Sequence, residues 1–169
     1  FTAASFQRQD RWTLLVQQMD RWHPSIHQLR LSLSFLPNWR IDDVMVSYAV
    51  DGAGVGPHFD RYDVFLLQGL GQREWRLGPT CDDSTPQLGG GGLNLIPEFE
   101  PESTFLLNPG DVLYVPPGIA HWGIAHGASM TFSIGLRAPP IAALLARRTD
   151  AVLEHLSSTI LLEDGATAT

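Results

Sequence analysis

From Asp43 to Arg137 the chain is divided into short apolar segments by glycine, proline, asparagine and aspartate. The segments are rich in β-branched and aromatic residues: VMVSYAV, YDVFLLQGLG, REWRLG, STFLLN, DVLYVPP, AHWGIAHG and MTFSIGLR. Such residues favour strands, and the residues between them favour turns. Several short strands at this spacing predict an antiparallel sandwich or barrel, so we expect a mainly β fold. Only residues 78–102, which include the glycine run Gly89 to Gly92, break the pattern and predict a long surface loop.

The segments on either side of this β-rich region have apolar residues at helical spacing. Before it, RWTLLVQQMDRW (residues 11–22) and the run from Ile26 to Phe35 predict two helices. After it, the stretch from Ala142 to Leu156 has an apolar stripe interleaved with charged residues and predicts a third. We therefore expect one domain with N-terminal helices over residues 1–140, followed by a C-terminal helical segment over residues 141–169.

The composition restricts the partners and the compartment. The net charge of -7 argues against nonspecific binding to nucleic acid and fits a basic partner. The single cysteine, Cys81, excludes an internal disulfide framework and suits a reducing compartment, so we expect a cytoplasmic protein. No apolar run approaches the ~20 residues of a membrane span, so no contact with a membrane is expected. Because the chain begins at Phe1 rather than at methionine, we expect it to be part of a longer protein.

His58 and Asp60 follow a glycine-proline turn and precede a strongly apolar run. In a strand, residues two apart point to the same face, so both side chains project into the barrel if the barrel is correct. An aspartate is rarely left unpaired in a protein interior, and a bound cation would offset the cost of burying it. A nitrogen donor beside a carboxylate suits borderline divalent metals such as Fe(II), Mn(II) or Zn(II).

His121 is the best candidate for a third ligand. The segment GDVLYVPPGIAHWG predicts a strand, a tight turn at Pro116 to Gly118, and a returning strand with His121 near its start. That route can bring His121 back to His58 and Asp60. Two histidines and one carboxylate on one side of a metal form the facial triad of non-haem Fe(II) oxygenases, which leaves coordination positions open. A zinc hydrolase would also use three protein ligands and a water, so both kinds of site remain open here.

Three features together resemble one family: HFD at residues 58–60, a basic residue fifteen positions after His58, and GDVLYVPPGIAH. They resemble the JmjC-type 2-oxoglutarate oxygenases of the cupin superfamily. The segment WRIDDVMVSYAVDGAGVGPHFDRYDVFLLQGLGQREWRLG is most similar to the YcfD-like bacterial ribosomal oxygenases, which hydroxylate an arginine of a large-subunit ribosomal protein. The resemblance extends from Trp12 to Pro139. It implies a double-stranded β-helix core (the cupin/JmjC jelly roll), Fe(II), 2-oxoglutarate as cosubstrate, and O2.

The resemblance also implies roles for individual residues. His58, Asp60 and His121 match the iron ligands, and Arg73 matches the basic residue that anchors the distal carboxylate of 2-oxoglutarate. A planar guanidinium can hold a carboxylate through two hydrogen bonds and does not lose its charge. This chain differs from the family at Ala49, where relatives tend to have a serine that helps to bind the cosubstrate. The missing hydroxyl could come from Ser47 or Ser133, or from Tyr48 or Thr131.

The implied substrate is a basic peptide of a ribosomal protein, and we expect acidic and aromatic side chains to receive its cationic side chain. Asp51 and Asp63 are candidate acceptors, as are Asp42 and Asp43, and Tyr62 or Trp122 could stack on a guanidinium. No direct contact with nucleic acid is expected, because the chain is acidic. The resemblance also implies a homodimer in the longer protein, through a region that would begin at Ile141.

Three other functions stay open at this point. A histidyl hydroxylase of the same family would share the triad. A cupin metal enzyme with Zn or Mn would need no carboxylate anchor, and a noncatalytic cupin module would not turn over 2-oxoglutarate. We expect His126 to be a structural residue near the site rather than a fourth ligand.

Overall fold

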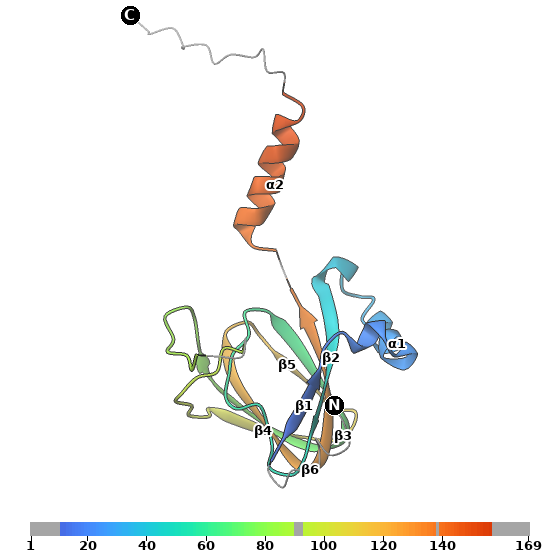
Figure 1. The fold of residues 1–169 in the computed structure, drawn as a ribbon, viewed down its shortest axis with the longest axis vertical. Helices are drawn as coiled ribbons and strands as arrows, with labels where there is room; N and C mark the ends of the chain where they lie inside the picture. The colour runs from blue at the N-terminus through green and yellow to red at the C-terminus, as the bar shows by residue number, and fades with distance from the viewer. Residues whose placement is uncertain (1–10, 90–92, 138, 157–169) are drawn as a thin grey trace, which may run out of the picture. The chain divides into compact units, whose positions relative to one another are not determined.

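The computed structural model describes residues 11–89, 93–137 and 139–156. Within these ranges six strands form one antiparallel sheet in the order β1-β2-β6-β3-β4, with β5 paired to β3 (Figure 1). The strands are β1 (Thr13–Val16), β2 (Ile41–Ala49), β3 (Asp63–Thr80), β4 (Ser103–Leu107), β5 (Val112–Val115) and β6 (Ile119–Leu136). The helices are α1 (Pro24–Ser32) and α2 (Ile141–Leu153), with two short 3-10 helices at Met19–Arg21 and Asn38–Arg40.

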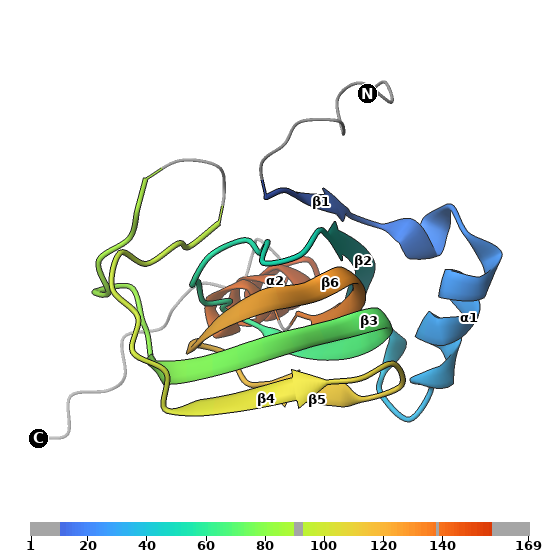
Figure 2. The same cartoon turned by 90° about the horizontal axis from the view of Figure 1, so that it is seen from below.

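The mainly β fold predicted from the sequence is confirmed, with four of the predicted strands joined into two. β3 and β6 are 18 residues long each and run side by side along most of their length (Figure 2). One half of β3 pairs with β5 and the other half with β4. The two long strands therefore connect both halves of the double-stranded β-helix. The predicted surface loop lies between β3 and β4, and its Gly90 to Gly92 lie outside the described residues.

The first predicted helix is wrong. Residues 13–16 form β1, which pairs with β2 from Thr13 opposite Ala49 to Val16 opposite Val46. The apolar spacing of this segment fits a helix as well as a strand, and pairing with the open edge of β2 decides between them. Because β1 is extended, Leu15 lines the central cavity of the barrel rather than one face of a helix.

The other two helices agree with the sequence to within a few residues. α1 packs Ile26 and Leu29, together with Leu33 directly after the helix, against a buried cluster of β2 and β6. α2 belongs to a second compact unit, separate from the one that ends at Arg137, and its described residues are exposed. Residues 157–169 of the predicted C-terminal segment lie outside the described ranges. No helix among the described residues is long and apolar enough to cross a membrane.

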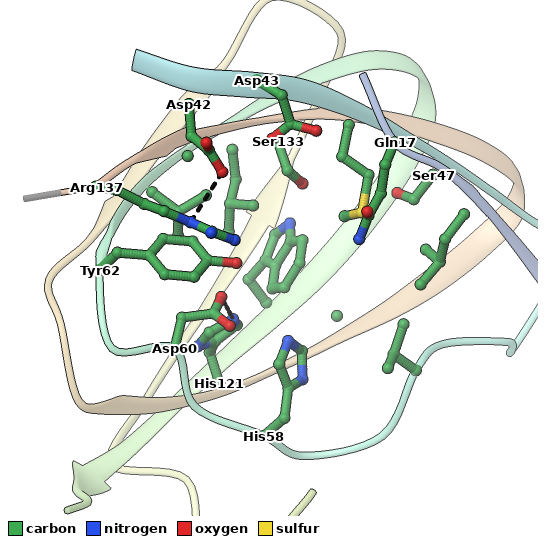
Figure 3. A pocket seen from close by; sticks show the side chains of 18 of the residues that line it. Gln17, Asp42, Asp43, Ser47, His58, Asp60, Tyr62, His121, Ser133 and Arg137 are labelled. Atoms are coloured by element: carbon green, nitrogen blue, oxygen red, sulfur yellow. Dashed lines mark ion pairs between the residues drawn. The ribbon is translucent and has the colours of Figure 1, made fainter. Parts of the chain in front are cut away.

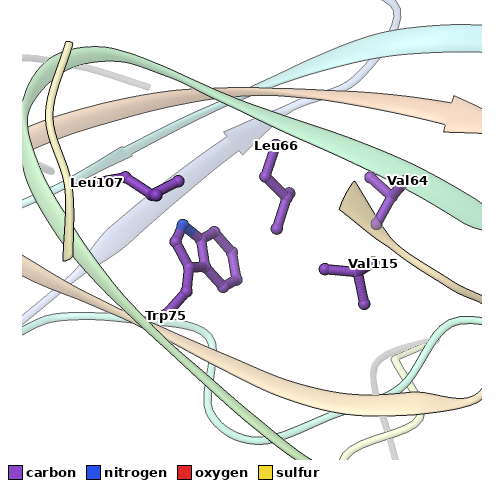
Figure 4. Packing of buried hydrophobic residues seen from close by; sticks show 5 residues of the cluster. All are labelled: Val64, Leu66, Trp75, Leu107 and Val115. Atoms are coloured by element: carbon purple, nitrogen blue, oxygen red, sulfur yellow. The ribbon is translucent and has the colours of Figure 1, made fainter. Parts of the chain in front are cut away.

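The main core cluster fills the barrel from three strands. It consists of Val64, Leu66 and Trp75 of β3, Leu107 of β4 and Val115 of β5 (Figure 4). Three of these, Val64, Leu66 and Trp75, also line the central cavity. The core therefore forms one wall of the cavity, so that polar groups inside it face an apolar surface.

The face that β3 turns to the cavity changes along the strand. Before residue 68 the even-numbered Val64 and Leu66 line the cavity, and after residue 72 the odd-numbered Arg73 and Trp75 do so. The register with β6 shifts twice between these residues, at Gln68/Leu70 and at Leu70/Gln72. We call residues 68–72 the β3 corner. Gly71 within it has a φ of 61°, a left-handed conformation that glycine adopts without strain.

Replacing Gly71 by alanine should destabilise the protein by at least ~3 kcal/mol, because two costs combine. The left-handed backbone strains any residue with a Cβ, and the added Cβ would lie only 2.1 Å from the carbonyl oxygen of Ala128. Gly127 is a matched control, because it has a φ of 70° and a Cβ there would meet no atom within 4 Å. Gly127→Ala should cost only ~1–2 kcal/mol. Urea unfolding of both variants checks this, and equal losses would contradict the clash at Gly71.

Candidate metal centre

His58 and His121 are held opposite each other by their own backbones. The amide of His58 donates to the carbonyl of His121 at 3.0 Å, and the amide of His121 donates back to the carbonyl of His58 at 2.8 Å. The turn at Pro116 to Gly118 makes this pairing possible, and the amide of Gly118 donates to the carbonyl of Asp60 at 2.7 Å. The main chain thus brings together the three side chains that the sequence nominated, along the route predicted through that turn.

The ligand atoms of His58, Asp60 and His121 all lie within 4.8 Å of one another. Each histidine places Nδ1 2.9 Å from a backbone carbonyl, that of Gly56 for His58 and that of Ile119 for His121. A carbonyl oxygen only accepts hydrogen bonds, so each Nδ1 carries the proton and each Nε2 keeps a free lone pair. The Nε2 of His121 lies 3.7 Å from a carboxylate oxygen of Asp60. Two nitrogen lone pairs and a carboxylate thus converge, a donor set that suits a borderline divalent cation.

Burial disfavours charge on this cluster. It lowers the pKa of His121 to about 3, with a further contribution from nearby His58. Burial likewise raises the pKa of Asp60, although His58, the Tyr62 hydroxyl and Arg137 oppose the shift. A neutral His121 is the form that binds a metal, and a bound cation would favour the ionised Asp60.

The metal-free protein should lose stability as the pH falls below 6.5, through His121. Its folded-state pKa of about 3 lies below the unfolded value of 6.5, so the unfolded chain takes up the proton first. The contribution is fully present above pH 6.5 and is lost between pH 6.5 and about 3. At ~1.4 kcal/mol for each pH unit, His121 alone should lower the free energy of unfolding by about 2 kcal/mol from pH 6.5 to about 5. The raised pKa of Asp60 acts in the opposite direction, because the folded state takes up that proton first.

Urea unfolding with a chelator present checks this pH dependence. His121→Gln should flatten it, whereas His126→Gln should leave it as in the parent, because His126 lies on the same strand with a half-exposed side chain. An unchanged pH dependence in His121→Gln would show that another group is responsible.

A cavity of about 340 Å³ opens beside the three side chains (Figure 3). Its lining includes both apolar core residues and polar residues. The polar residues are Gln17, Gln18, Asp42, Asp43, Ser47, His58, Asp60, Tyr62, Arg73, His121, Ser133 and Arg137. At its wall, Arg137 Nε lies 2.8 Å from a carboxylate oxygen of Asp42, and the Arg137 guanidinium lies 5.3 Å from the centre of the Tyr62 ring.

Arg73 is a buried cation on the cavity wall, with 3% of its surface exposed. Its Nη1 donates to Ser47 Oγ at 2.8 Å, its Nε to Ser129 Oγ at 3.3 Å, and its Nη2 to the Ser129 carbonyl at 3.4 Å. All these acceptors are neutral, and Arg73 forms no ion pair within the described part of the chain. Burial lowers its pKa to about 10, so it stays charged at neutral pH. An unpaired buried cation on a cavity wall is suited to hold an anionic ligand.

The predicted site residues separate into two groups. Ser47, Ser133 and Tyr62 line the cavity with the three candidate ligands and Arg73. Asp51, Asp63 and Trp122 do not line it, and each has other partners. Asp51 accepts from the Gly127 amide at 2.7 Å, Asp63 pairs with Arg40 at 2.8 Å and with the Tyr114 hydroxyl, and Trp122 lies beside Arg76 and Phe99. Trp122 also follows His121 directly in β6, so the two side chains point to opposite faces.

Sequence reasoning missed Ser129, which accepts hydrogen bonds from Arg73, and Gln68, which donates to Ser129. Ser129 binds the Arg73 guanidinium twice, and Gln68 donates to Ser129 Oγ at 3.0 Å. One signal was available for Ser129, because it shares the odd-numbered face of β6 with Thr131, Ser133 and His121. Gln68 gave no such signal, since nothing in the sequence marks the β3 corner beyond its two glycines. Arg137 was missed because it lies at the end of β6, next to a proline-rich stretch.

The chain is similar to proteins of one known family. The family model described as JmjC domain matches residues 28–144. A curated protein of Haemophilus influenzae, named probable ribosomal oxygenase, is 42% identical over 137 residues, which cover 80% of this chain and 34% of that protein. The ribosomal protein uL16 3-hydroxylase of Escherichia coli is 43% identical over 148 residues, covering 85% of this chain and 38% of that protein. The chain thus spans little more than a third of the length of these two relatives.

Solved structures of a ribosomal oxygenase are also similar to this chain. The ribosomal oxygenase YcfD of Escherichia coli is 37% identical, with a TM-score of 0.79 over 100% of this chain and 44% of that chain. The same protein has been solved in complex with cobalt and 2-oxoglutarate, and that structure matches with a TM-score of 0.78.

Proposed function

This chain belongs to the JmjC domain family, and on that premise we propose that it is the catalytic part of an Fe(II)- and 2-oxoglutarate-dependent protein hydroxylase. Its proposed substrate is an arginine side chain of a large-subunit ribosomal protein, which would place its work in the cytoplasm. The observation that carries the proposal is the meeting, in one cavity, of three metal-binding side chains and the unpaired cation Arg73. In the proposed reaction, the three side chains would bind the metal and Arg73 would bind the cosubstrate.

His58, Asp60 and His121 would hold the iron through two Nε2 atoms and a carboxylate. A facial set of three protein ligands leaves positions for the cosubstrate and O2. Iron with 2-oxoglutarate and O2 supplies hydroxylation coupled to decarboxylation, in which one oxygen atom enters the product and the other enters succinate. The hydrogen bonds from the two Nδ1 atoms to Gly56 and Ile119 would fix both imidazole rings in the binding orientation.

Arg73 would hold the distal carboxylate of 2-oxoglutarate. The Trp75 ring lies between Arg73 and the metal-binding side chains. Its centre is 6.0 Å from the Arg73 guanidinium carbon and 5.9 Å from the centre of the His121 ring. A short dicarboxylate could therefore lie along Trp75, between Arg73 and the metal ligands. The Ser47 hydroxyl beside Arg73 could supply the hydroxyl that Ala49 lacks. The indole Nε1 of Trp75 is a buried donor without a partner among the described residues, and a ligand could accept from it.

Two carboxylates on the cavity wall favour a cationic substrate. Asp42 and Asp43 line the cavity beside Tyr62, and Arg137 already places a guanidinium between Asp42 and the Tyr62 ring. The chemistry of this wall thus suits a guanidinium from a basic peptide. The net charge of -7 would favour the approach of such a peptide. The relative named uL16 3-hydroxylase suggests which ribosomal protein to test first.

The experiment is a turnover assay with Fe(II), 2-oxoglutarate, O2 and basic peptides that together cover uL16. Succinate is measured, and mass spectrometry locates any added oxygen. One oxygen on an arginine, lost when that arginine is replaced by lysine in the peptide, supports the proposal. One oxygen on a histidine would move the assignment to a histidyl hydroxylase. Absence of succinate from iron-loaded protein would contradict the proposal and favour a metal enzyme of other chemistry or a binding module.

A further inference from the structure

The β3 corner decides that Arg73 faces the cavity. In a regular strand, only residues separated by an even number of positions point to the same face. Leu66 and Arg73 are seven positions apart, yet both line the cavity. β6 makes no such change, since His121, Gly123 and Ser133 all line the cavity from odd positions. The irregular backbone of β3 between residues 68 and 72 therefore turns Arg73 inward. Whatever holds this corner also sets the position of the guanidinium.

The side chain of Gln68 holds the corner from inside. It is 1% exposed, and its Nε2 lies 2.7 Å from the carbonyl of Leu70 and 3.1 Å from the carbonyl of Gly71. Its Oε1 accepts from the Thr131 hydroxyl at 2.8 Å. The orientation of the amide is fixed by these partners, because carbonyl oxygens can only accept. Gln68 thus satisfies carbonyls at the irregular point where the register of the β3–β6 ladder shifts.

The same amide reaches Arg73 through one intermediate residue. Gln68 Nε2 lies 3.0 Å from Ser129 Oγ, and that oxygen also accepts from Arg73 Nε at 3.3 Å. Ser129 is fully buried, so water does not replace either contact. A hydroxyl oxygen has two lone pairs, so Ser129 Oγ can accept from both donors. The two N–H groups of Gln68 Nε2 are shared among three acceptors, Ser129 Oγ and the carbonyls of Leu70 and Gly71. Moving Gln68 would therefore move both the backbone before Arg73 and one of its acceptors.

We propose that Gln68 is a positioning residue that sets the orientation of the Arg73 guanidinium, and with it the affinity for the dicarboxylate cosubstrate. The inference rests on the proposed function for the identity of the ligand. Gln68 itself does not line the cavity, so it acts only through the β3 corner and Ser129. An ordinary buried glutamine that only stabilises the fold would leave the affinity for the cosubstrate unchanged.

Gln68→Met tests this, because methionine keeps the volume and removes every hydrogen bond of the amide. The matched control is Gln72→Met, four positions along the same strand, whose exposed side chain binds Asn108. Calorimetry with Mn(II)-loaded protein should give a dissociation constant for 2-oxoglutarate raised about tenfold in Gln68→Met and within about twofold of the parent in Gln72→Met. Affinity for Mn(II) should stay within about twofold in both, and in turnover KM should rise more than kcat falls. An unchanged 2-oxoglutarate constant in folded Gln68→Met overturns the inference.

A second measurement needs no cosubstrate and separates this inference from the proposed function. The Nε–H resonance of Arg73 in ligand-free protein, assigned by its loss in Arg73→Lys, should shift in Gln68→Met and not in Gln72→Met. If the parent does not bind 2-oxoglutarate, the proposed function fails, and this resonance still decides the role of Gln68. If Gln68→Met does not fold, Thr131→Val removes only the bond to Gln68 Oε1. The resonance should then shift in Thr131→Val, and its constancy there overturns the inference.

Discussion

Replacing His58 by alanine should lower the affinity for Fe(II) or Mn(II) at least about a hundredfold and reduce succinate formation below detection. Loss of an outer hydrogen-bond partner of a metal ligand already costs about 10- to 100-fold, and loss of a ligand should cost more. His58 contributes one of three donors that lie within 4.8 Å of one another. Equilibrium titration of the metal, alongside the turnover assay, gives both quantities.

His126→Ala is the matched control for this prediction. His126 is on β6, five positions after His121, and its Nε2 lies 3.4 Å from Glu74 rather than near the candidate ligands. Its replacement should leave metal affinity and turnover unchanged. A His58→Ala protein that binds metal like the parent would place the metal elsewhere and remove the basis of the proposed function.

Replacing Arg73 by methionine should raise the dissociation constant of 2-oxoglutarate at least about a hundredfold, because a buried charge-assisted pair would be lost. Arg73→Lys should bind the cosubstrate better than Arg73→Met but at least about tenfold less well than the parent, because lysine lacks the planar fork. Affinity for the metal should be retained in both. This pattern, measured by calorimetry on Mn(II)-loaded protein, distinguishes an anchor for the cosubstrate from a general support of the site.

The stability of Arg73→Met tests the same prediction without ligand. A buried cation held only by neutral acceptors gains little for the fold, since burial opposes its charge. The free energy of unfolding should therefore stay within ~1 kcal/mol of the parent, while cosubstrate binding is lost. Arg76→Met is the control on the opposite face of β3, where Arg76 pairs with Glu74 at 2.7 Å. It should leave 2-oxoglutarate binding unchanged. Equal weakening by both changes would indicate a general effect on β3.

Much of the site could be anticipated from local rules. His58 and Asp60 are two residues apart, which predicts that their side chains point to the same face. The turn at Pro116 to Gly118 likewise depends only on neighbouring residues, so both features could be predicted from short segments of the sequence. Arg73 and Trp75 were expected on one face from simple alternation, and both line the cavity. Alternation could not predict which face of β3 points into the cavity at Arg73, because that depends on the irregular β3 corner before it.

The features that local patterns did not anticipate have a common physical origin in contacts between distant segments. β1 looks helical by its own spacing and becomes a strand because β2 offers it a partner. Asp63, predicted as an acceptor for the substrate, does not line the cavity and pairs with Arg40, which is 23 residues away in the sequence. The Asp51 carboxylate likewise accepts a hydrogen bond from the amide of Gly127. In each case the competing partner comes from a part of the chain that a local pattern does not include.

The β3 corner also has an evolutionary consequence, which concerns insertions and deletions rather than substitutions. Leu66 and Arg73 share the cavity across an odd separation only because the backbone between them is irregular. A chain one residue shorter here would have an even separation, and a straight strand would then turn the arginine inward without a left-handed glycine. Chain length and the glycine at position 71 should therefore change together among homologues, and a deletion that kept the corner would turn the arginine out of the barrel.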